Sequence, residues 1–201
     1  NNLNGISSIA TSDMDGDGIS DIVYASGGNN TIGWYKSYGD GILGVERVVT
    51  DTANGVSAMV AVDMDKDGDM DLITASTDNN TISWYDNMDG NGTFGFKQMI
   101  SDTATGVHDI FVEDIDGDGD NDVLAGHAYS GTVVWYETKK AEITSDPTAV
   151  NTCPGSDASF SISADYAGSY QWQVDEGSGF TDLVNDAEYS GVNTKNLHIS
   201  V

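Results

Sequence analysis

The chain has 201 residues, 33 of them acidic and 7 basic, which gives a formal net charge of −26 at pH 7. A field of this sign repels the phosphates of nucleic acids and anionic lipids, so we expect neither as a partner. The single cysteine, Cys153, excludes an internal disulfide framework and a cysteine-rich zinc site. No apolar run approaches the roughly 18 residues of a membrane span, so no membrane insertion is expected.

The first two thirds of the chain contain a repeat whose starts are 50 and 51 residues apart. Three acidic segments align without gaps: DMDGDGISD at 13–21, DMDKDGDMD at 63–71 and DIDGDGDND at 114–122. An apolar segment precedes each one, and each is followed by one of the segments NNTIGWY, NNTISWY and SGTVVWY. Self-similarity of this period indicates an array of equivalent structural units.

Each unit is predicted to consist of four β-strands. In the second repeat, apolar alternation over 56–62 predicts a largely buried strand. A β-branched run at 72–74 follows the acidic segment, and an Asn-Asn turn precedes a third strand at 81–85. The segment 96–100 is predicted to be the fourth strand. Four strands in roughly 50 residues is the size of one β-propeller blade.

Composition changes near residue 138, and no acidic segment recurs after it. The remaining residues have strand signals at 158–163, 169–174, 180–184 and 197–201, separated by turns rich in Gly, Ser and Asp. This pattern is typical of part of a β-sandwich. We therefore expect two domains, 1–138 and 139–201.

The acidic segments have the form D-x-D-x-D-G-x-x-D, which suits a metal site. Aspartates at positions 1, 3, 5 and 9 converge, position 7 offers a backbone carbonyl, and the glycine at position 6 permits a sharp turn. Hard oxygen donors at this spacing match calcium, which takes six to eight oxygens. Magnesium favours a tighter octahedron, and zinc favours His or Cys.

Two other interpretations of these segments fit the sequence less well. Asp-Gly pairs are common in solvated turns, but four carboxylates within nine residues, three times over, are costly without a cation. An EF-hand requires flanking helices and a Glu at position 12, whereas Tyr24, Thr74 and Ala125 stand there, between predicted strands.

The acidic spacing, the strand order and the repeat together resemble the FG-GAP/VCBS repeats of calcium-binding β-propellers, such as those of integrin α-chains and bacterial surface proteins. The resemblance implies three calcium ions, one per repeat. The ligands it implies are Asp13, Asp15, Asp17, Ile19 (carbonyl) and Asp21; Asp63, Asp65, Asp67, Asp69 (carbonyl) and Asp71; and Asp114, Asp116, Asp118, Asp120 (carbonyl) and Asp122. Three blades do not close a ring, and the chain starts at Asn1 in register with a repeat boundary, so further blades are expected upstream.

Residues 143–201 resemble a bacterial immunoglobulin-like module through ITSDP, CPG and SYQWQV. Trp172 is expected in its core, on the third strand. Two further strands, and a partner for Cys153, are expected beyond Val201. The fold prediction is thus all-β: three four-stranded β-propeller blades, forming part of a larger propeller, plus a partial immunoglobulin-like β-sandwich.

Several other residues have less specific roles. The Trp-Tyr pairs at 34–35, 84–85 and 135–136 are expected to pack between blades rather than bind sugars. His108 and His127 each occur in one repeat only and are not expected to be catalytic or metal-binding. Lys66 replaces a glycine at position 4 of the second segment, where its charge is expected to weaken that site slightly or to shield it.

Two functions are compatible with the sequence. The first is a non-catalytic, calcium-binding extracellular module for adhesion, ligand binding or display within a larger modular surface or secreted protein. The second is an accessory, carbohydrate-binding region of a large secreted polysaccharide-active enzyme. Neither places catalysis in these residues. In both, the protein is secreted or on the cell surface, in bacteria, and binds a protein or carbohydrate that the sequence does not identify.

Overall fold

The computed structural model describes residues 3–139, 142–148, 150–151, 153, 155–165, 170–175, 177 and 179–200. Throughout these residues the protein is all-β, built from antiparallel sheets, which confirms the predicted class. The described residues contain no helix with the length and apolar character to span a membrane. The chain divides into two compact units, Asn1–Thr138 and Lys139–Val201.

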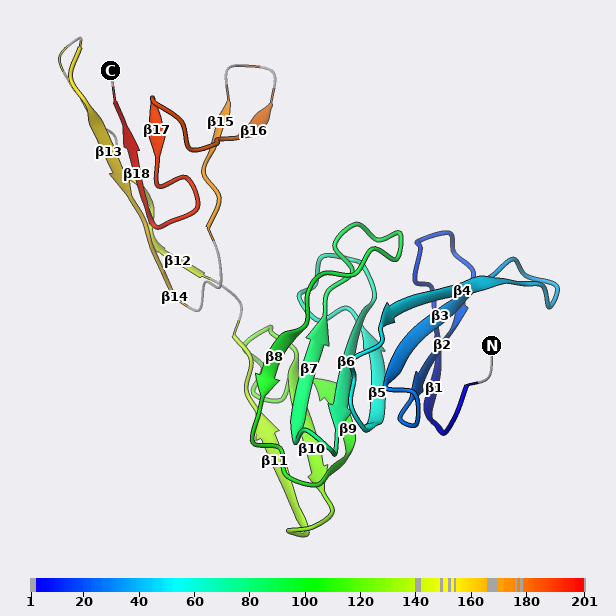
Figure 1. Ribbon diagram of the computed structural model, residues 1–201. Helices are drawn as coiled ribbons and strands as arrows, with labels where there is room; N and C mark the ends of the chain where they lie inside the picture. The colour runs from blue at the N-terminus through cyan, green and yellow to red at the C-terminus, as the bar shows by residue number, and fades with distance from the viewer. Residues whose placement is uncertain are drawn as a thin grey trace. The chain divides into compact units, whose positions relative to one another are not determined.

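The first unit contains three sheets that follow one another along the chain (Figure 1). Sheet 1 has the order β1 (Ile6–Ser12), β2 (Asp21–Ser26), β3 (Thr31–Ser37) and β4 (Leu43–Thr50). Sheet 2 repeats it with β5 (Val56–Val62), β6 (Asp71–Ser76), β7 (Thr81–Tyr85) and β8 (Gln98–Ser101). Both sheets are four-stranded antiparallel meanders, as expected of propeller blades.

The predicted fourth strand of the second repeat is displaced along the chain. It was expected at 96–100, but β8 starts at Gln98, and the side chain of Phe96 is 97% exposed. Glycine-rich residues before it pair only through a bridge between Asn87 and Phe94. The apolar content of this segment was therefore a poor guide to its burial.

The third sheet corrects the prediction of three four-stranded blades. It contains β9 (Val107–Glu113), β10 (Asp122–His127) and β11 (Thr132–Tyr136), and in the described part of the chain it has three strands. After β11 the chain passes into the second unit, and its next strand, β12 (Glu142–Ser145), pairs with β14 (Ser163–Asp165) instead.

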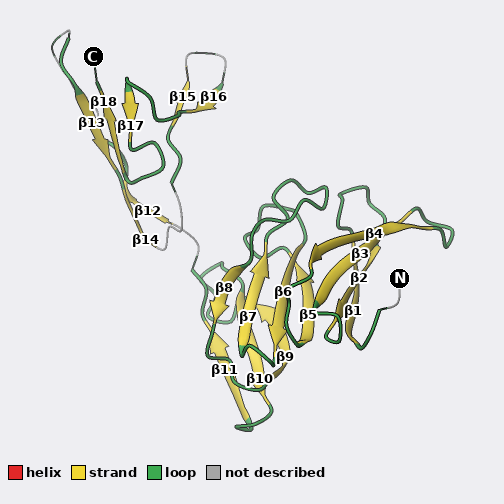
Figure 2. Ribbon diagram, viewed as in Figure 1, coloured by secondary structure: helices red, strands yellow, loops and turns green. Residues whose placement is uncertain are grey.

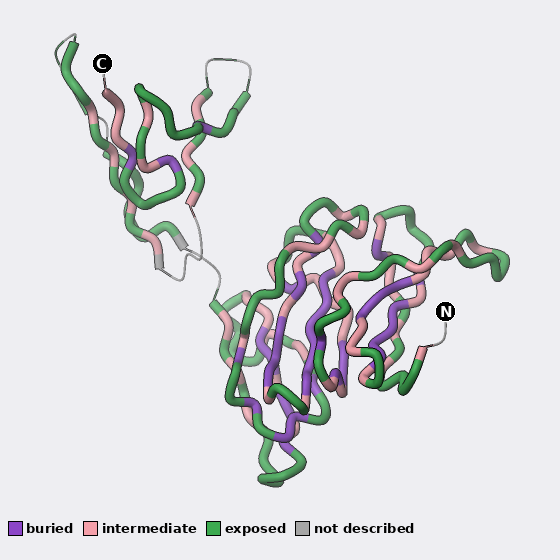
Figure 3. Tube along the Cα trace, viewed as in Figure 1, coloured by how far each residue is buried: buried purple, intermediate pink, exposed green. Residues whose placement is uncertain are grey.

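The cores lie between adjacent sheets, where the repeated apolar positions meet. The first strands are neighbours, with β1 against β5 and β5 against β9. One core cluster joins Ile32 and Trp34 of sheet 1 to Val56 and Met59 of sheet 2. A second cluster joins sheets 2 and 3 in the same way. Figure 3 shows the buried residues concentrated along the inner strands of the sheets, β2, β3, β6, β7 and β10.

The linkers DTANGV (51–56) and DTATGV (102–107) lead from one sheet to the next. Each is hydrogen-bonded to the turn between the second and third strands of the preceding sheet. Ala53 is buried, and its backbone N–H donates to the carbonyl of Asn30 at 2.8 Å; Ala104 donates to Asn80 at the same distance. Both asparagines lie in the β2–β3 or β6–β7 turn with positive φ, 58° and 55°. Asparagine tolerates this conformation better than most residues, which explains its repetition at these turns.

The second unit consists of small sheets (Figure 2). Besides β12 and β14 it contains β13 (Ala158–Ser161), β15 (Gln173–Asp175), β16 (Phe180–Asp182), β17 (Tyr189–Ser190) and β18 (Asn196–Ile199). β13, β18 and β17 form one sheet, and β15 pairs with β16. The single strand predicted at 158–163 is divided at Ile162, whose N–H donates to the carbonyl of Lys195.

Trp172 precedes β15 rather than lying within it, and packs against the cluster of Leu183, Val192 and Leu197. Cys153 is exposed, with a free thiol. Asn1, Ser169 and Val201, which entered the sequence-based expectations, lie outside the described residues. The immunoglobulin-like character of this unit stays a prediction.

Candidate metal centre

The acidic segments form equivalent loops between the first two strands of each sheet. We call them loop 1 (13–21), loop 2 (63–71) and loop 3 (114–122), and number positions 1 to 9 within each. The glycine at position 6 has a positive φ in all three, at 84°, 103° and 98° for Gly18, Gly68 and Gly119. Residues with a side chain rarely adopt this conformation, so the D-x-D-x-D-G pattern fixes a sharp turn.

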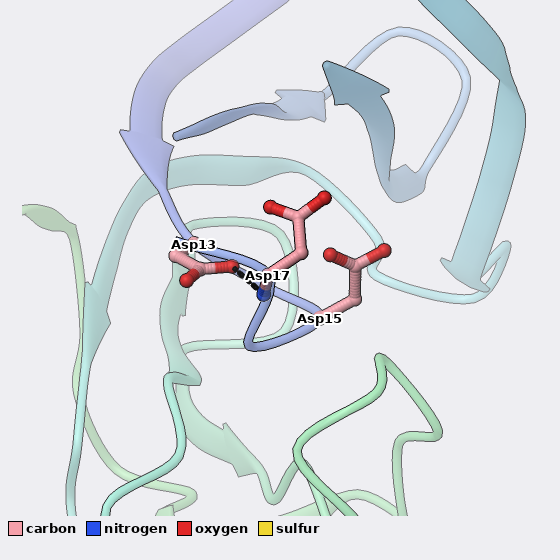
Figure 4. Close-up of side chains that lie close together, drawn as sticks. All are labelled: Asp13, Asp15 and Asp17. Carbon is pink, nitrogen blue, oxygen red and sulfur yellow. Dashed lines mark hydrogen bonds between the residues drawn. The ribbon is translucent and has the colours of Figure 1, made fainter. Parts of the chain in front are cut away.

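The aspartate at position 1 closes each loop onto itself. Its carboxylate accepts the backbone N–H of the position-6 glycine, at 2.7 Å for Asp13, 3.0 Å for Asp63 and 3.1 Å for Asp114. In loop 1, Asp13 also accepts the N–H of Asp17 at 3.2 Å, the contact drawn in Figure 4. These bonds curl each loop around its first residue.

The aspartate at position 9 anchors each loop to the sheet. Asp21, Asp71 and Asp122 are buried at the first residue of β2, β6 and β10. One carboxylate oxygen accepts the N–H of position 2, at 3.0, 3.0 and 3.2 Å. The other oxygen accepts the N–H of the second residue after the Trp-Tyr pair, at 2.8, 2.8 and 2.9 Å. A carboxylate has about four acceptor sites, so these bonds leave capacity for a metal.

Carboxylates from each loop converge, with one oxygen per residue within 4.8 Å of the others. The groups are Asp13, Asp15 and Asp17; Asp63, Asp65 and Asp71; Asp114, Asp116 and Asp122; and Asp116, Asp118 and Glu137. Oxygens that share one calcium ion at roughly 2.3–2.6 Å lie no more than about 5 Å apart. The all-oxygen donor sets therefore fit calcium in both chemistry and spacing.

Other sequence-predicted ligands do not belong to these groups. Asp21 is not grouped with the other aspartates of loop 1, nor Asp67 with those of loop 2. At position 7, the backbone N–H of Ile19, Asp69 and Asp120 donates to the position-5 carboxylate at 2.9, 2.9 and 3.0 Å. Their predicted carbonyl donation to an ion stays a prediction.

Sequence reasoning missed one residue beside each loop, the residue directly after the Trp-Tyr pair: Lys36, Asp86 or Glu137. Lys36 donates through Nζ to Asp15 and, at 2.7 Å, to Asp17. Glu137 joins Asp116 and Asp118 in the last group above. Extending the repeat alignment by one residue, to WYK, WYD and WYE, would have revealed the position.

The loops differ in their electrostatics. In loop 1, the hydrogen bond from Lys36 lowers the pKa of Asp17. In loop 2, burial raises the pKa of Asp71 to about 6, and burial together with the charges of Asp65 and Asp67 raises the pKa of Asp86. Loop 1 thus has its own cation, whereas loop 2 carries negative charge that favours a bound cation.

Lys66 contacts the neighbouring loop. Its Nζ donates to the carbonyl of Gly119 in loop 3 at 2.6 Å. The expected weakening or shielding of loop 2 by Lys66 stays a prediction. Lys66 has a φ of 63°, in the same positive region as its counterparts Gly16 and Gly117. The lysine therefore adopts a backbone conformation that favours glycine.

The loops are also bonded to their neighbours. The side-chain amide of Asn87 in sheet 2 donates to the carbonyl of Met14 in loop 1 at 3.1 Å, and this contact is buried. The side-chain amide of Asn121 in loop 3 donates to the carbonyl of Asp63 in loop 2 at 2.8 Å. A change in one loop therefore acts directly on the contact between two sheets.

The tryptophans of the Trp-Tyr pairs and the two histidines of the repeats differ in burial and contacts. Trp34 is fully buried and Trp84 half-buried between sheets, as predicted, whereas Trp135 is 44% exposed. His127 is buried, with Nδ1 3.1 Å from the Thr105 carbonyl and Nε2 3.1 Å from the Tyr136 hydroxyl. Both ring nitrogens of His127 thus lie within hydrogen-bond distance of protein oxygens. His108 is exposed.

Comparison with known families agrees with this geometry. The model of the FG-GAP-like repeat matches residues 13–74 and 63–125, and each match runs from the first aspartate of one loop to just beyond the next loop. Together the matches cover more than half of the chain. A search of curated proteins gave no significant match. The chain belongs to the FG-GAP-like repeat family.

Proposed function

We propose that this chain is a non-catalytic, calcium-binding module that serves adhesion, ligand binding or display in a larger surface or secreted protein. Repeats of this family are typical of extracellular and surface proteins, where they form adhesion and ligand-binding modules. The observation that carries the proposal is the recurrence of converging carboxylates at the same place in successive sheets.

The carboxylates at positions 1, 3 and 5, with the buried aspartate at position 9, would hold the ion. Calcium would supply positive charge at the start of the second strand of a blade, where it offsets the repulsion between neighbouring carboxylates. Since the loops bond to adjacent sheets through Asn87 and Asn121, this stabilisation would extend to the contacts between blades.

Thermal unfolding with and without calcium tests the proposal. Extracellular calcium modules bind at roughly 10⁻⁴–10⁻³ M, so millimolar calcium fills them outside a cell. A site filled at 100 times its Kd gains about 2.7 kcal/mol. We expect 10 mM calcium to raise the melting temperature above that in EGTA by roughly 10 °C or more.

Two controls define the result. Magnesium at the same concentration should give a much smaller shift, because it demands a tighter octahedron and retains its water. The double variant Asp65→Ala, Asp116→Ala, which removes a grouped carboxylate from loops 2 and 3, should lose most of the calcium effect. The same melting temperature in calcium and in EGTA would contradict the proposal.

A further inference from the structure

The residue after the Trp-Tyr pair has the same structural position in each sheet. The tyrosine pairs across the sheet with the residue that directly follows the position-9 aspartate: Tyr35 with Ile22, Tyr85 with Leu72 and Tyr136 with Val123. The next residue is therefore carried to the mouth of the loop in all three cases. Its identity changes from lysine to aspartate to glutamate: Lys36, Asp86 and Glu137.

In loop 1 this residue brings a cation to the carboxylates. The ammonium of Lys36 donates to Asp15 and to Asp17, which with Asp13 form the converging group of this loop. Figure 4 shows Asp15 and Asp17 directing their carboxylates to the same side of the loop. An ion bound there would have to displace the ammonium from both carboxylates.

The buried carboxylate of Asp15 explains why loop 1 needs a positive charge. Its side chain is 9% exposed, and its Oδ1 has no hydrogen-bond partner among the described residues. A carboxylate removed from water is costly unless a cation compensates it. Lys36 compensates the charge of this carboxylate through Oδ2.

Loops 2 and 3 have the opposite arrangement. The equivalent residue is an acid, and Glu137 places an oxygen within 4.8 Å of Asp116 and Asp118. Position 7 is also an aspartate in these loops, Asp69 or Asp120, but is Ile19 in loop 1. Loops 2 and 3 each contain five aspartates and are followed by the acid after the Trp-Tyr pair, whereas loop 1 contains four aspartates and is followed by a lysine.

We infer that the residue after the Trp-Tyr pair decides which cation fills each loop. Lys36 is the built-in cation of loop 1, which binds no calcium, whereas Asp86 and Glu137 add a carboxylate to calcium sites in loops 2 and 3. The inference rests on the proposed calcium binding. It reduces the number of ions from the three implied by the sequence resemblance to two.

Native mass spectrometry and calorimetry of the full 201-residue chain test the inference by counting bound calcium. The wild type should bind two ions. Lys36→Asp, which gives loop 1 the acid of loop 2, should bind three, and Asp86→Lys should bind one. Lys36→Arg keeps the cation at loop 1 and is the matched control, so it should still bind two.

The ion count separates failure of the inference from failure of the proposed function. Three ions in the wild type, unchanged in Lys36→Asp, would overturn the role of Lys36 and leave calcium binding intact. No bound calcium in the wild type would overturn the proposed function itself. The wild-type count decides the inference even when a variant does not fold, since it requires no substitution.

Discussion

Aspartates within one loop have different surroundings, and therefore different expected roles. Asp71 is buried and accepts two backbone N–H groups, from Met64 and Asn87, whereas Asp67 is exposed and accepts one, from Asp69. An asparagine at 71 has one acceptor oxygen for two buried donors. We expect Asp71→Asn to lower the free energy of unfolding in EGTA by about 1–3 kcal/mol.

Asp67→Asn is the matched substitution, because it keeps an oxygen for the N–H of Asp69. It should leave the stability in EGTA nearly unchanged and weaken only the stabilisation by calcium. Urea unfolding of both variants in EGTA and in calcium distinguishes the roles. Equal destabilisation by both variants in EGTA would show that the two buried hydrogen bonds of Asp71 contribute no more to the free energy of unfolding than the single exposed bond of Asp67.

Lys66 combines a strained backbone with a contact to the neighbouring loop. Its φ of 63° costs a residue with a side chain about 1 kcal/mol relative to glycine. Lys66→Met keeps this strain and loses the bond to the Gly119 carbonyl, whereas Lys66→Gly loses both. We expect Lys66→Gly to be more stable than Lys66→Met by about 1 kcal/mol in urea unfolding. Equal stability of the two variants would mean that the backbone strain is negligible.

Within sheet 1, Tyr24 connects three strands. It lies on β2, opposite Gly33 on β3, and its hydroxyl donates to Glu46 on β4. A Cβ at Gly33 would lie 2.8 Å from the Tyr24 hydroxyl oxygen, so glycine at 33 makes room for tyrosine at 24. Burial, followed by the bond to Glu46, raises the pKa of Tyr24 above its usual value near 10.

This pKa shift predicts a loss of stability in alkali. The unfolded chain releases the phenol proton near pH 10 while the folded chain retains it, so folding stability falls as the pH rises above about 10. Tyr24→Phe should be less stable at pH 8 but should show a shallower decline between pH 9 and 11. Urea unfolding across this range, with Tyr129→Phe as the exposed control, measures the slopes. Parallel slopes for wild type and Tyr24→Phe would contradict the shift.

The strands that the sequence predicted best are those with several independent signals. The segments 56–62 and 81–85 have alternating or β-branched residues, flanking turns and counterparts in other repeats, and they form β5 and β7 at the predicted residues. The segment at 96–100 had only apolar content, and Phe96 is exposed. Local hydrophobicity does not determine whether a partner surface exists, which explains this error.

The acidic loops were predictable because their ligands are contiguous in sequence. Lys36, Asp86 and Glu137 were missed because they reach the loops through strand pairing, 15 residues beyond the last loop aspartate. The contact between Lys66 and Gly119 spans two blades and has no counterpart in the repeat pattern. Such contacts depend on the packing of sheets, which the spacing of residues does not encode.

In the first unit, the outer faces of sheets 1 and 3 expose apolar residues whose counterparts in the other repeats are buried between sheets. Val133 and Trp135 are 74% and 44% exposed, although the matching Ile32 and Trp34 are fully buried. On sheet 1, Ile6 and Ile9 are exposed, whereas their counterparts Val56 and Met59 are buried against Ile32 and Trp34. The exposed pairs therefore match the two sides of an interface that the protein already forms.

We expect the isolated chain to associate with a second copy through these faces, sheet 3 of one copy on sheet 1 of the other. Ile9→Asp or Val133→Asp should shift sedimentation velocity profiles toward monomer, because each places a charge in the apolar contact. Phe96→Ser, at an exposed residue away from both faces, is the control. A wild type that stays monomeric at 100 μM would contradict the expectation.

Amide hydrogen exchange with and without calcium tests the assignment of cations to loops most directly, because it locates the effect along the chain. Calcium should slow exchange in peptides that cover 63–71 and 114–122, where Gly68 and Gly119 donate to position-1 aspartates. The peptide that covers 13–21, with Lys36 at its carboxylates, should exchange equally in calcium and EGTA. Equal protection of all three loops by calcium, or of none, would contradict the assignment.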